Sequence, residues 1–374
     1  MSEFVKQNRS MRAKADASTF LTALKKVSQI LRKSSIPVLE GVHICFQDGQ
    51  CALTGTNMDT WIVAELPAEG DHFACVLSHP EVVEEVCRHF AGSLTLELSE
   101  TGDEKHHRLI ATLSCGVRVA EFDAYPGEDY PDSPAINGDV AFSANAAKLL
   151  ERVGKVSYAA QKPTQETPAM RSCVQFSGSW VYALDGARAA WDDGTETVPQ
   201  PFLLYAESLR FLRVFGDAQV EFSFSPPRLF VTDGRTTIIY RMVEGQPFNL
   251  EKAIPRTYIE TFSVCPQAFL SELHYLKAAA PKTRTLYVYL QGKELLMPVN
   301  GKKFKTVLDI ERTGDTEIGF NLNYVADALK PFAKVKSVTI KISGSHTPVV
   351  IEAEGRSDHA LVLPLRNSSA YAAA

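Results

Sequence analysis

The sequence lacks the long apolar segment that a membrane-spanning helix needs. None of its 374 residues lie in a run approaching about 18 consecutive apolar residues. Residues 1–16 are polar, whereas a secretory signal would have an apolar centre. We therefore expect a cytoplasmic protein that has no membrane partner.

The sequence also lacks the spacings of metal sites and disulfide frameworks. Its seven cysteines form no CxxC pair, and their odd number argues against a set of disulfides. Its nine histidines include no HExxH motif. We expect the cysteines to be small buried apolar residues, and we predict no metal ion and no cofactor.

A threefold internal repeat is present. Three segments align without gaps, each with apolar residues at its positions 1, 2, 5 and 8: Phe20–Ser28, Leu149–Ser157 and Phe269–Lys277. This spacing predicts one amphipathic helix that is used three times. The copies start about one domain length apart, which is far longer than a solenoid period.

Strands and a second helix follow each of these helices. Alternating runs predict strands at Val38–Phe46, Cys51–Thr54, Cys173–Phe176, Trp180–Ala183 and Leu286–Leu290. Hairpin turns are predicted at Asp48-Gly49, Asp185-Gly186 and Gln291-Gly292. Second helices are predicted at Glu81–Phe90, Ala206–Phe215 and Asn323–Phe332, followed by strands at Leu94–Leu98, Val220–Phe224 and Val338–Ile342. The fold class is therefore α+β with antiparallel sheets.

Turn residues cluster at 125–137 and 255–261, where the periodicity lapses. These stretches predict three domains, at residues 1–135, 136–257 and 258–374, the last with a C-terminal tail. Because both linkers are short, we expect the domains to be docked against one another.

Six segments, in the same order, resemble the beta subunit of bacterial DNA polymerase III. They are Ser34-Ser-Ile-Pro-Val-Leu-Glu-Gly41, Pro126-Gly-Glu-Asp-Tyr-Pro131, Leu184-Asp-Gly-Ala-Arg188, the passage 244–255, Phe320-Asn-Leu-Asn-Tyr-Val-Ala-Asp-Ala-Leu329 and Leu363-Pro-Leu-Arg366. The resemblance covers roughly residues 16 to 366. It implies a clamp fold of three similar domains, in which two chains close head to tail into a ring with twelve helices lining the hole.

The resemblance also implies a function without catalysis. Such a sliding clamp encircles double-stranded DNA and tethers DNA polymerase and other proteins that carry a clamp-binding motif, after a clamp loader has placed it. A formal net charge of -5 argues against tight DNA binding. A ring needs only weak phosphate contacts on its inner wall, and an acidic outer surface would repel DNA from the wrong face.

Basic residues on or near the repeated helices are the candidate DNA contacts. They are Lys25, Lys26, Arg32, Lys33, Lys148, Arg152, Lys155, Arg210, Arg213, Lys330 and Lys334. The alternative is that each pair is an ordinary solvated helix face. The helix around Glu81, Glu84 and Glu85 departs from the pattern because it is acidic.

The resemblance further implies a peptide-binding cleft between the second and third domains. Its candidate residues are Met170, Leu184, Gly186, Arg188, Ala189, Phe248, Lys252, Ala253, Tyr324, Leu361, Leu363, Pro364, Leu365 and Arg366. The alternative is that these residues only pack strands and a tail. Ala187 and Ala189 stand where the family usually has His and a larger aliphatic residue, which predicts a wider floor. The tail after Leu365 is longer than usual, and it is a tag remnant, a disordered end or a lid.

Three functions stay open at this point. The leading one is a DNA-encircling clamp, a homodimer in which Phe122 is an apolar contact. A second is a clamp-derived accessory or mobile-element protein that keeps the peptide cleft but does not serve the main replisome. The third is an unrelated enzyme, with Asp185 and Arg188 as its catalytic pair. No nucleophile or base stands at motif spacing to them, and Asp-Gly is a common hairpin turn, so we predict no catalytic residues.

Overall fold

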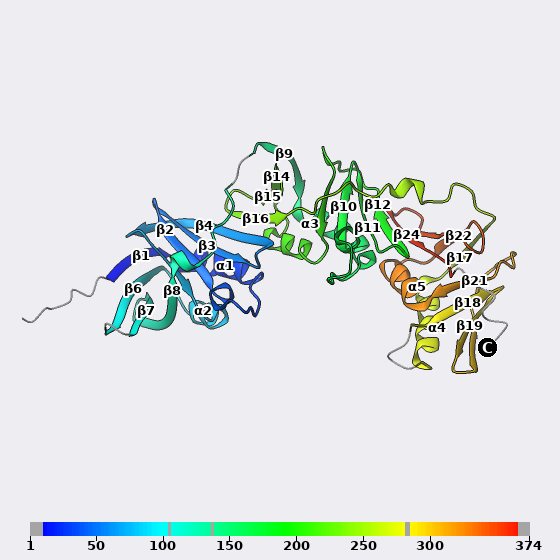
Figure 1. Cartoon of the computed structure of the whole chain (residues 1–374), viewed down its shortest axis with the longest axis horizontal. Helices are drawn as coiled ribbons and strands as arrows, with labels where there is room; N and C mark the ends of the chain where they lie inside the picture. The colour runs from blue at the N-terminus through cyan, green and yellow to red at the C-terminus, as the bar shows by residue number, and fades with distance from the viewer. Residues whose placement is uncertain (1–9, 104–105, 136–137, 281–284, 366–374) are drawn as a thin grey trace, which may run out of the picture. The chain divides into compact units, whose positions relative to one another are not determined.

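The computed structural model describes residues 10–103, 106–135, 138–280 and 285–365. The chain forms two compact units, residues 1–147 with 210–242, and residues 148–209 with 243–374. Helices and antiparallel sheets occur in both (Figure 1), as the sequence predicts. The division between the units passes through the predicted middle domain, so the three domain boundaries stay a prediction.

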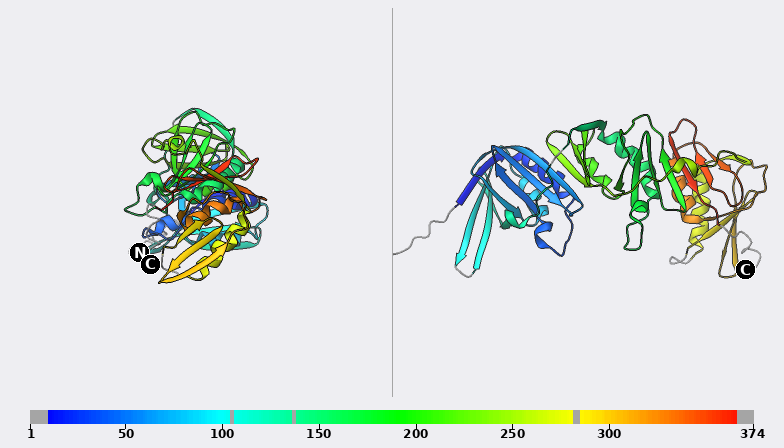
Figure 2. Two further views of the ribbon diagram at one scale, coloured as in Figure 1. Left: turned by 90° about the vertical axis from the view of Figure 1, so that its right-hand side faces the viewer. Right: turned by 45° about the horizontal axis from the view of Figure 1, so that its top comes forward.

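The first unit is built on a 12-stranded antiparallel sheet. Its strands are β1 (Ser10–Asp16), β2 (Val42–Gln47), β3 (Gln50–Thr56), β4 (Thr60–Gly70), β5 (Phe73–Leu77), β6 (Ser93–Asp103), β7 (His106–Cys115), β8 (Arg118–Pro126), β9 (Val140–Asn145), β14 (Gln219–Ser225), β15 (Arg228–Thr232) and β16 (Thr236–Arg241). β1 pairs with both β4 and β6, so strands β1 to β8 close on themselves (Figure 2, blue and cyan). β4 also pairs with β16, which joins the remaining four strands to this closed part.

Two helices pack against each other in the first unit, α1 (Ala17–Ser28) and α2 (Pro80–Cys87). Three of the four periodic apolar side chains of α1, Phe20, Leu24 and Val27, are fully buried, and Leu21 is half-buried. Asp16 caps α1, since its Oδ1 accepts a hydrogen bond from the Thr19 N–H at 2.9 Å. Hydrogen bonds from Ser18 and Thr19 hold the pKa of Asp16 below its usual value.

The second unit contains an 8-stranded and a 4-stranded sheet. The larger has β10 (Cys173–Ser177), β11 (Trp180–Leu184), β12 (Arg188–Asp192), β13 (Phe202–Tyr205), β17 (Glu260–Val264), β22 (Val338–Ile342), β23 (Val349–Glu352) and β24 (Asp358–Val362). The smaller has β18 (Tyr287–Gln291), β19 (Glu294–Val299), β20 (Lys302–Val307) and β21 (Ile318–Asn321). β12 pairs with β24, so strands of the predicted second and third domains share one sheet.

Three further α-helices complete the fold. They are α3 (Ala146–Val156), α4 (Pro266–Ala278) and α5 (Leu322–Leu329), and they confirm predicted helices.

The structure differs from the sequence predictions in three places. The helix predicted at Ala206–Phe215 is instead a 3-10 helix, Leu209–Phe215. The strand predicted from Val38 begins only at Val42, because Pro37 starts a 3-10 turn. Cys265, before α4, is exposed, so the prediction that every cysteine is buried was wrong.

Candidate functional site

Arg188, at the start of β12, is the centre of a group of charged and aromatic side chains. Its Nε atom donates to Oδ2 of Asp185 at 3.1 Å, and its Nη1 atom donates to Oδ2 of Asp327 at 2.6 Å. The guanidinium also lies over the ring of Tyr324, at 4.6 Å, and over that of Tyr158, at 5.8 Å. Arg188 therefore connects the β11–β12 turn to helix α5.

The β11–β12 turn holds Asp185 in place for this contact. Oδ1 of Asp185 accepts hydrogen bonds from the backbone N–H groups of Ala187 and Arg188, at 2.8 and 3.0 Å. Gly186, which follows Asp185, has a φ of +92°, a backbone conformation that residues with a side chain rarely adopt. The Asp-Gly sequence thus explains both the turn and the direction of the carboxylate.

The ionisation of the group follows from burial and pairing. Burial opposes the charge on Asp327, but hydrogen bonds from Lys330 and Arg188 outweigh it and lower the pKa of Asp327. Burial raises the pKa of Tyr158 and of Tyr324. These shifts keep Asp327 charged and the two tyrosines neutral at neutral pH.

A cleft of about 950 Å³ adjoins this group, and we call it the Arg188 cleft. Its walls include Tyr158, Lys162, Arg171, Ser172, Asp185 and Tyr324. The Ser172 hydroxyl is buried and has no hydrogen-bond partner among the described residues. Lys162 and Arg171 were missed from the sequence, because they precede the Leu184–Arg188 motif in the chain and no spacing rule links them to it.

The apolar part of the predicted cleft forms a separate small cluster on the sheet. Four predicted residues meet there, packed with Tyr182, Trp191, Leu250 and Val350: Leu184, Ala189, Ala253 and Leu361. Leu184 and Ala189 face each other across the β11–β12 pair. Leu361 lies opposite Ala189 on β24.

The segment after β24 contacts the β11–β12 turn and strand β21. Leu363 is 37% exposed, and its N–H donates to the Ala187 carbonyl at 2.9 Å. Pro364 is buried, and the Leu365 N–H donates to the Gly319 carbonyl at 2.7 Å. Arg366 lies outside the described residues.

Three other predicted residues lie elsewhere. Met170 is half-buried in the 3-10 helix Ala169–Ser172, and its methyl group faces Gly245. Phe248 is 40% exposed and lines a different concave site, next to Trp180. Lys252 is exposed in a short 3-10 turn.

Comparison with known proteins decides what kind of fold this is. Residues 11–134 match the family model of the DNA polymerase III beta subunit, N-terminal domain. Proteins named Beta sliding clamp from Pseudomonas aeruginosa and Salmonella typhimurium are 21% and 23% identical, over 90% and 95% of this chain and 94% and 100% of their own. The crystal structure of the DNA polymerase III subunit beta from Pseudomonas aeruginosa has a TM-score of 0.79 at 19% identity, covering 96% of this chain and 100% of that one.

The chain is a divergent member of the DNA polymerase III beta family. Its fold is the clamp fold of that family. No helix among the described residues is long and apolar enough to cross a membrane. Within the same residues, no group of three or more His, Cys, Asp and Glu side chains is placed to hold a metal ion.

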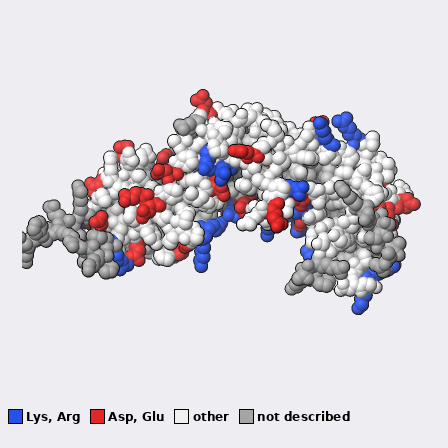
Figure 3. All heavy atoms as spheres, in the orientation of Figure 1, with Lys and Arg blue, Asp and Glu red and all other residues white. Residues whose placement is uncertain are grey.

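The basic residues proposed to face DNA in this beta-family chain divide into two groups. The exposed group is Lys25, Arg32, Lys33, Lys148, Arg210, Arg213, Lys330 and Lys334. α1 ends at Ser28, so Arg32 and Lys33 lie beyond the helix on which they were expected. On the face drawn in Figure 3, Lys and Arg side chains stand in small groups among Asp and Glu.

The second group is held within the fold. Arg152 is 9% exposed and donates from Nε to Oδ1 of Asp192 at 2.6 Å, so the expectation of a solvated Arg152 was wrong. Nζ of Lys155 lies 3.3 Å from Oδ2 of the same aspartate. Nζ of Lys26 donates to Oγ1 of Thr236 at 2.8 Å. These three cations have internal partners and are weaker candidates for phosphate contact. In the exposed group, Nζ of Lys330 also lies 2.7 Å from Oδ1 of Asp327, and Nε of Arg213 donates to Oε1 of Gln29 at 2.9 Å.

The acidic helix α2 is partly neutralised. Arg88 follows it, and its guanidinium lies 2.7 Å from Glu84 and 3.0 Å from Glu85. Glu81, at the first turn, is exposed. The negative charge of α2 is therefore concentrated at its N-terminal end, where it interacts favourably with the helix dipole.

Proposed function

We propose that this chain is a sliding clamp of DNA replication, a non-catalytic ring that encircles double-stranded DNA and tethers DNA polymerase. The observation that carries the proposal is the likeness to beta sliding clamps over 90% or more of the chain. A clamp loader would place the ring on DNA. A function in DNA replication would place the protein in the cytoplasm.

The proposed contact with DNA is electrostatic and independent of sequence. Lys25, Arg32 and Lys334 are exposed and extend from or follow helices. Such side chains attract phosphates without reading base edges. Because the chain is acidic overall, with a net charge of -5, the contacts would be weak and mobile, which suits a ring that moves along DNA.

The proposed tether is a peptide site formed by the Arg188 cleft and the neighbouring apolar cluster. An extended partner segment would place apolar side chains against the exposed Leu363 and the partly buried Leu184 and Ala253 of the cluster, while Tyr324 and Arg188 fix its polar end. Each fully buried apolar anchor contributes roughly 1.5 to 3 kcal/mol. After the cost of ordering the segment, binding of about micromolar strength would allow partners to exchange.

The proposed ring is a head-to-tail homodimer that joins strand β8 of one copy to strand β20 of the other. β20 is at the edge of its sheet and carries the exposed residues Lys302 and Lys305. Among the described residues, β8 has no partner strand on its outer side over residues 118–123, where Glu121 and Asp123 are exposed and Asp123 is paired with Arg108 at 2.6 Å. Open edges of opposite charge favour pairing between copies, and such a heterologous contact forms a ring only if the rotation closes.

Retention on DNA tests the ring function. The chain is loaded onto nicked circular DNA with its clamp loader and passed through a sizing column, and half of the sample is linearised first. A clamp stays with the circle and leaves the linear DNA through its ends. Equal loss from both would contradict encirclement, and it would favour a clamp-derived protein that uses only the peptide site.

A further inference from the structure

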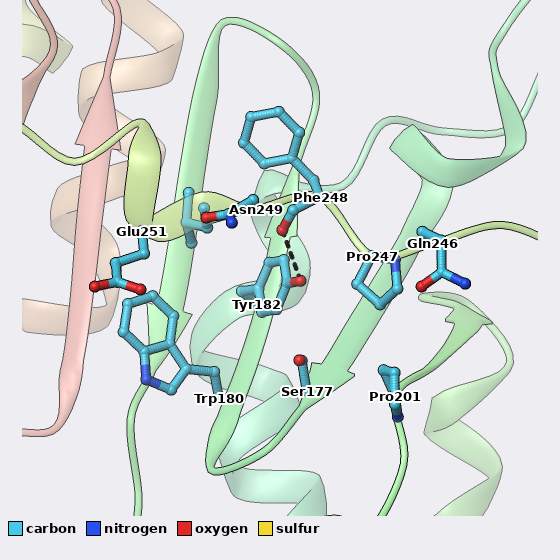
Figure 4. A pocket seen from close by; sticks show the side chains of 10 residues that line it. Ser177, Trp180, Tyr182, Pro201, Gln246, Pro247, Phe248, Asn249 and Glu251 are labelled. Atoms are coloured by element: carbon cyan, nitrogen blue, oxygen red, sulfur yellow. Dashed lines mark hydrogen bonds between the residues drawn. The ribbon is translucent and has the colours of Figure 1, made fainter.

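A second concave site lies in the second unit, between Trp180 of β11 and the segment 246–251, which includes Phe248. It has a volume of about 530 Å³, and we call it the Trp180 groove. Figure 4 shows Trp180 on one side of the groove, Pro247 and Pro201 on the other, and Tyr182 between them. It shares no lining residue with the Arg188 cleft, but Trp180, Tyr182 and Leu250 also belong to or pack against the neighbouring apolar cluster.

Hydrogen bonds and ring stacking hold the walls of the Trp180 groove in place. The Tyr182 hydroxyl donates to the Phe248 carbonyl at 2.8 Å, and the Phe248 N–H donates to Oε1 of Gln175 at 2.8 Å. The Trp180 ring is stacked with Trp191, at a centroid distance of 6.2 Å. The groove is therefore preformed, and a ligand would not have to order it.

The lining of the groove indicates the kind of ligand. Flat aromatic faces beside proline rings are typical of grooves that bind polyproline II segments, which lose little entropy on binding. The Trp180 ring is half-buried and offers the groove an aromatic surface against which a proline ring can pack. The Glu251 carboxylate lies beside Trp180 in Figure 4, is exposed, and has no ion-pair partner within the described part of the chain.

We infer that the Trp180 groove binds a proline-rich extended segment of a partner protein, with Arg or Lys next to the prolines. The basic residue would pair with Glu251. The chain's own ends, residues 1–9 and 366–374, contain no proline, so they do not supply this ligand. Single-stranded nucleic acid could also stack on Trp180, but the Glu251 carboxylate would repel its phosphates.

Fluorescence anisotropy with a labelled Pro-x-x-Pro peptide flanked by arginine tests the inference on the full chain. We expect replacement of the prolines by alanine to weaken binding by about tenfold or more, and Trp180→Ala to do the same, because an aromatic anchor is lost. Trp180→Phe, which keeps a ring, should recover part of the affinity. Leu363→Asp lies outside the groove and should bind as the wild type does.

A charge exchange at Glu251 gives a more specific test of the proposed ion pair, because a substitution at this exposed residue should not unfold the chain. Glu251→Lys should weaken the arginine-flanked peptide by about fivefold and bind the matching glutamate-flanked peptide as well as the wild type binds the original. Equal affinity for the proline and alanine peptides would overturn the inference. So would an unchanged affinity of Trp180→Ala, or binding of an oligothymidine in place of the proline peptide.

Discussion

Arg152 and Asp192 form a buried ion pair in which Nε lies 2.6 Å from Oδ1. The aspartate is 1% exposed and also accepts from the Ser357 hydroxyl at 2.9 Å. Ser357 directly precedes β24, while Asp192 ends β12 and Arg152 belongs to α3. The pair therefore fixes helix α3 of the predicted second domain to the paired strands β12 and β24, the latter of which belongs to the predicted third domain.

Removal of one partner of this pair should destabilise the protein strongly. Arg152→Met leaves the Asp192 charge buried without its main partner, which costs about 3 to 5 kcal/mol in the free energy of unfolding. Urea unfolding followed by circular dichroism measures this difference. The matched control is Lys148→Met on the same helix, where the side chain is exposed and the expected change is within about 0.5 kcal/mol. Similar losses for both variants would contradict the structural role of Arg152.

The same pair predicts how stability depends on pH. Burial raises the pKa of Asp192, but hydrogen bonds from Arg152 and Ser357 outweigh it, so the folded pKa lies below its usual value. The stability that the ionised aspartate contributes is complete above its unfolded pKa of about 3.9, and it is lost as the pH falls through the folded pKa. The stability gap between the wild type and Asp192→Asn should therefore be widest near neutral pH and narrow below about pH 4. Urea unfolding at several pH values checks this, and a gap that is constant with pH would contradict it.

The sequence predicted the repeated elements well because their signals are local. The apolar periodicity of Phe20–Ser28 and Phe269–Lys277 marks helices whose apolar sides are buried, and Asp48-Gly49 has the positive φ angles of its predicted hairpin. The failures are long-range. No sequence pattern near Arg152 indicates that it pairs with Asp192, so the sequence predicted a solvated Arg152 where the fold has a buried one.

The same limit applies to the candidate sites. Leu184, Ala189, Ala253 and Leu361 were expected together from the resemblance, and the fold does bring them into one cluster. Lys162 was not anticipated, nor were the residues of the Trp180 groove other than Phe248. These residues come from loops and strands that meet only after β10 to β12 have formed, and loops carry no periodicity.

DNA association should depend on exposed cations and not on buried ones. Lys25→Glu combined with Arg32→Glu should weaken loading on circular DNA, because two phosphate contacts become repulsive. Binding should also fall steeply with added salt and be indifferent to base sequence. Retention after gel filtration at two salt concentrations measures both effects. Thr22→Glu on the exposed part of α1 controls for added charge alone, and equal retention of the double variant and the wild type would show that these residues form only a solvated surface.

A reciprocal charge exchange tests the proposed dimer. Lys302→Glu with Lys305→Glu makes β20 acidic, and Glu121→Lys with Asp123→Lys makes β8 basic. Each variant alone should be a monomer, since like charges would face each other across the edge strands. An equimolar mixture should restore a dimer, because opposite charges meet again at both contacts. Sedimentation velocity distinguishes these states, and dimers of either variant alone would exclude this pair of edges.

Partner-peptide binding at the Arg188 cleft is the most direct test of the tether. We expect a labelled segment with glutamine followed by aliphatic and aromatic residues to bind the wild type. Leu363→Asp should abolish binding, because the docked ligand would bury an unpaired charge on this 37% exposed residue. Tyr324→Ala should weaken binding more modestly, by removing one wall of the cleft. Sedimentation should show that both variants assemble as the wild type does.

Two further variants separate the cleft from its surroundings. Glu251 lines neither the Arg188 cleft nor the apolar cluster, so Glu251→Lys should leave the affinity for this peptide unchanged. Deletion of the residues after Asn367 should leave it unchanged or increase it, the latter if the tail covers the cleft. The wide floor at Ala187 and Ala189 should favour a bulky final anchor, so a peptide ending in tryptophan should bind more tightly than one ending in valine. Fluorescence anisotropy measures all of these affinities. Equal binding by the wild type and Leu363→Asp would mean that the tether lies elsewhere on the chain.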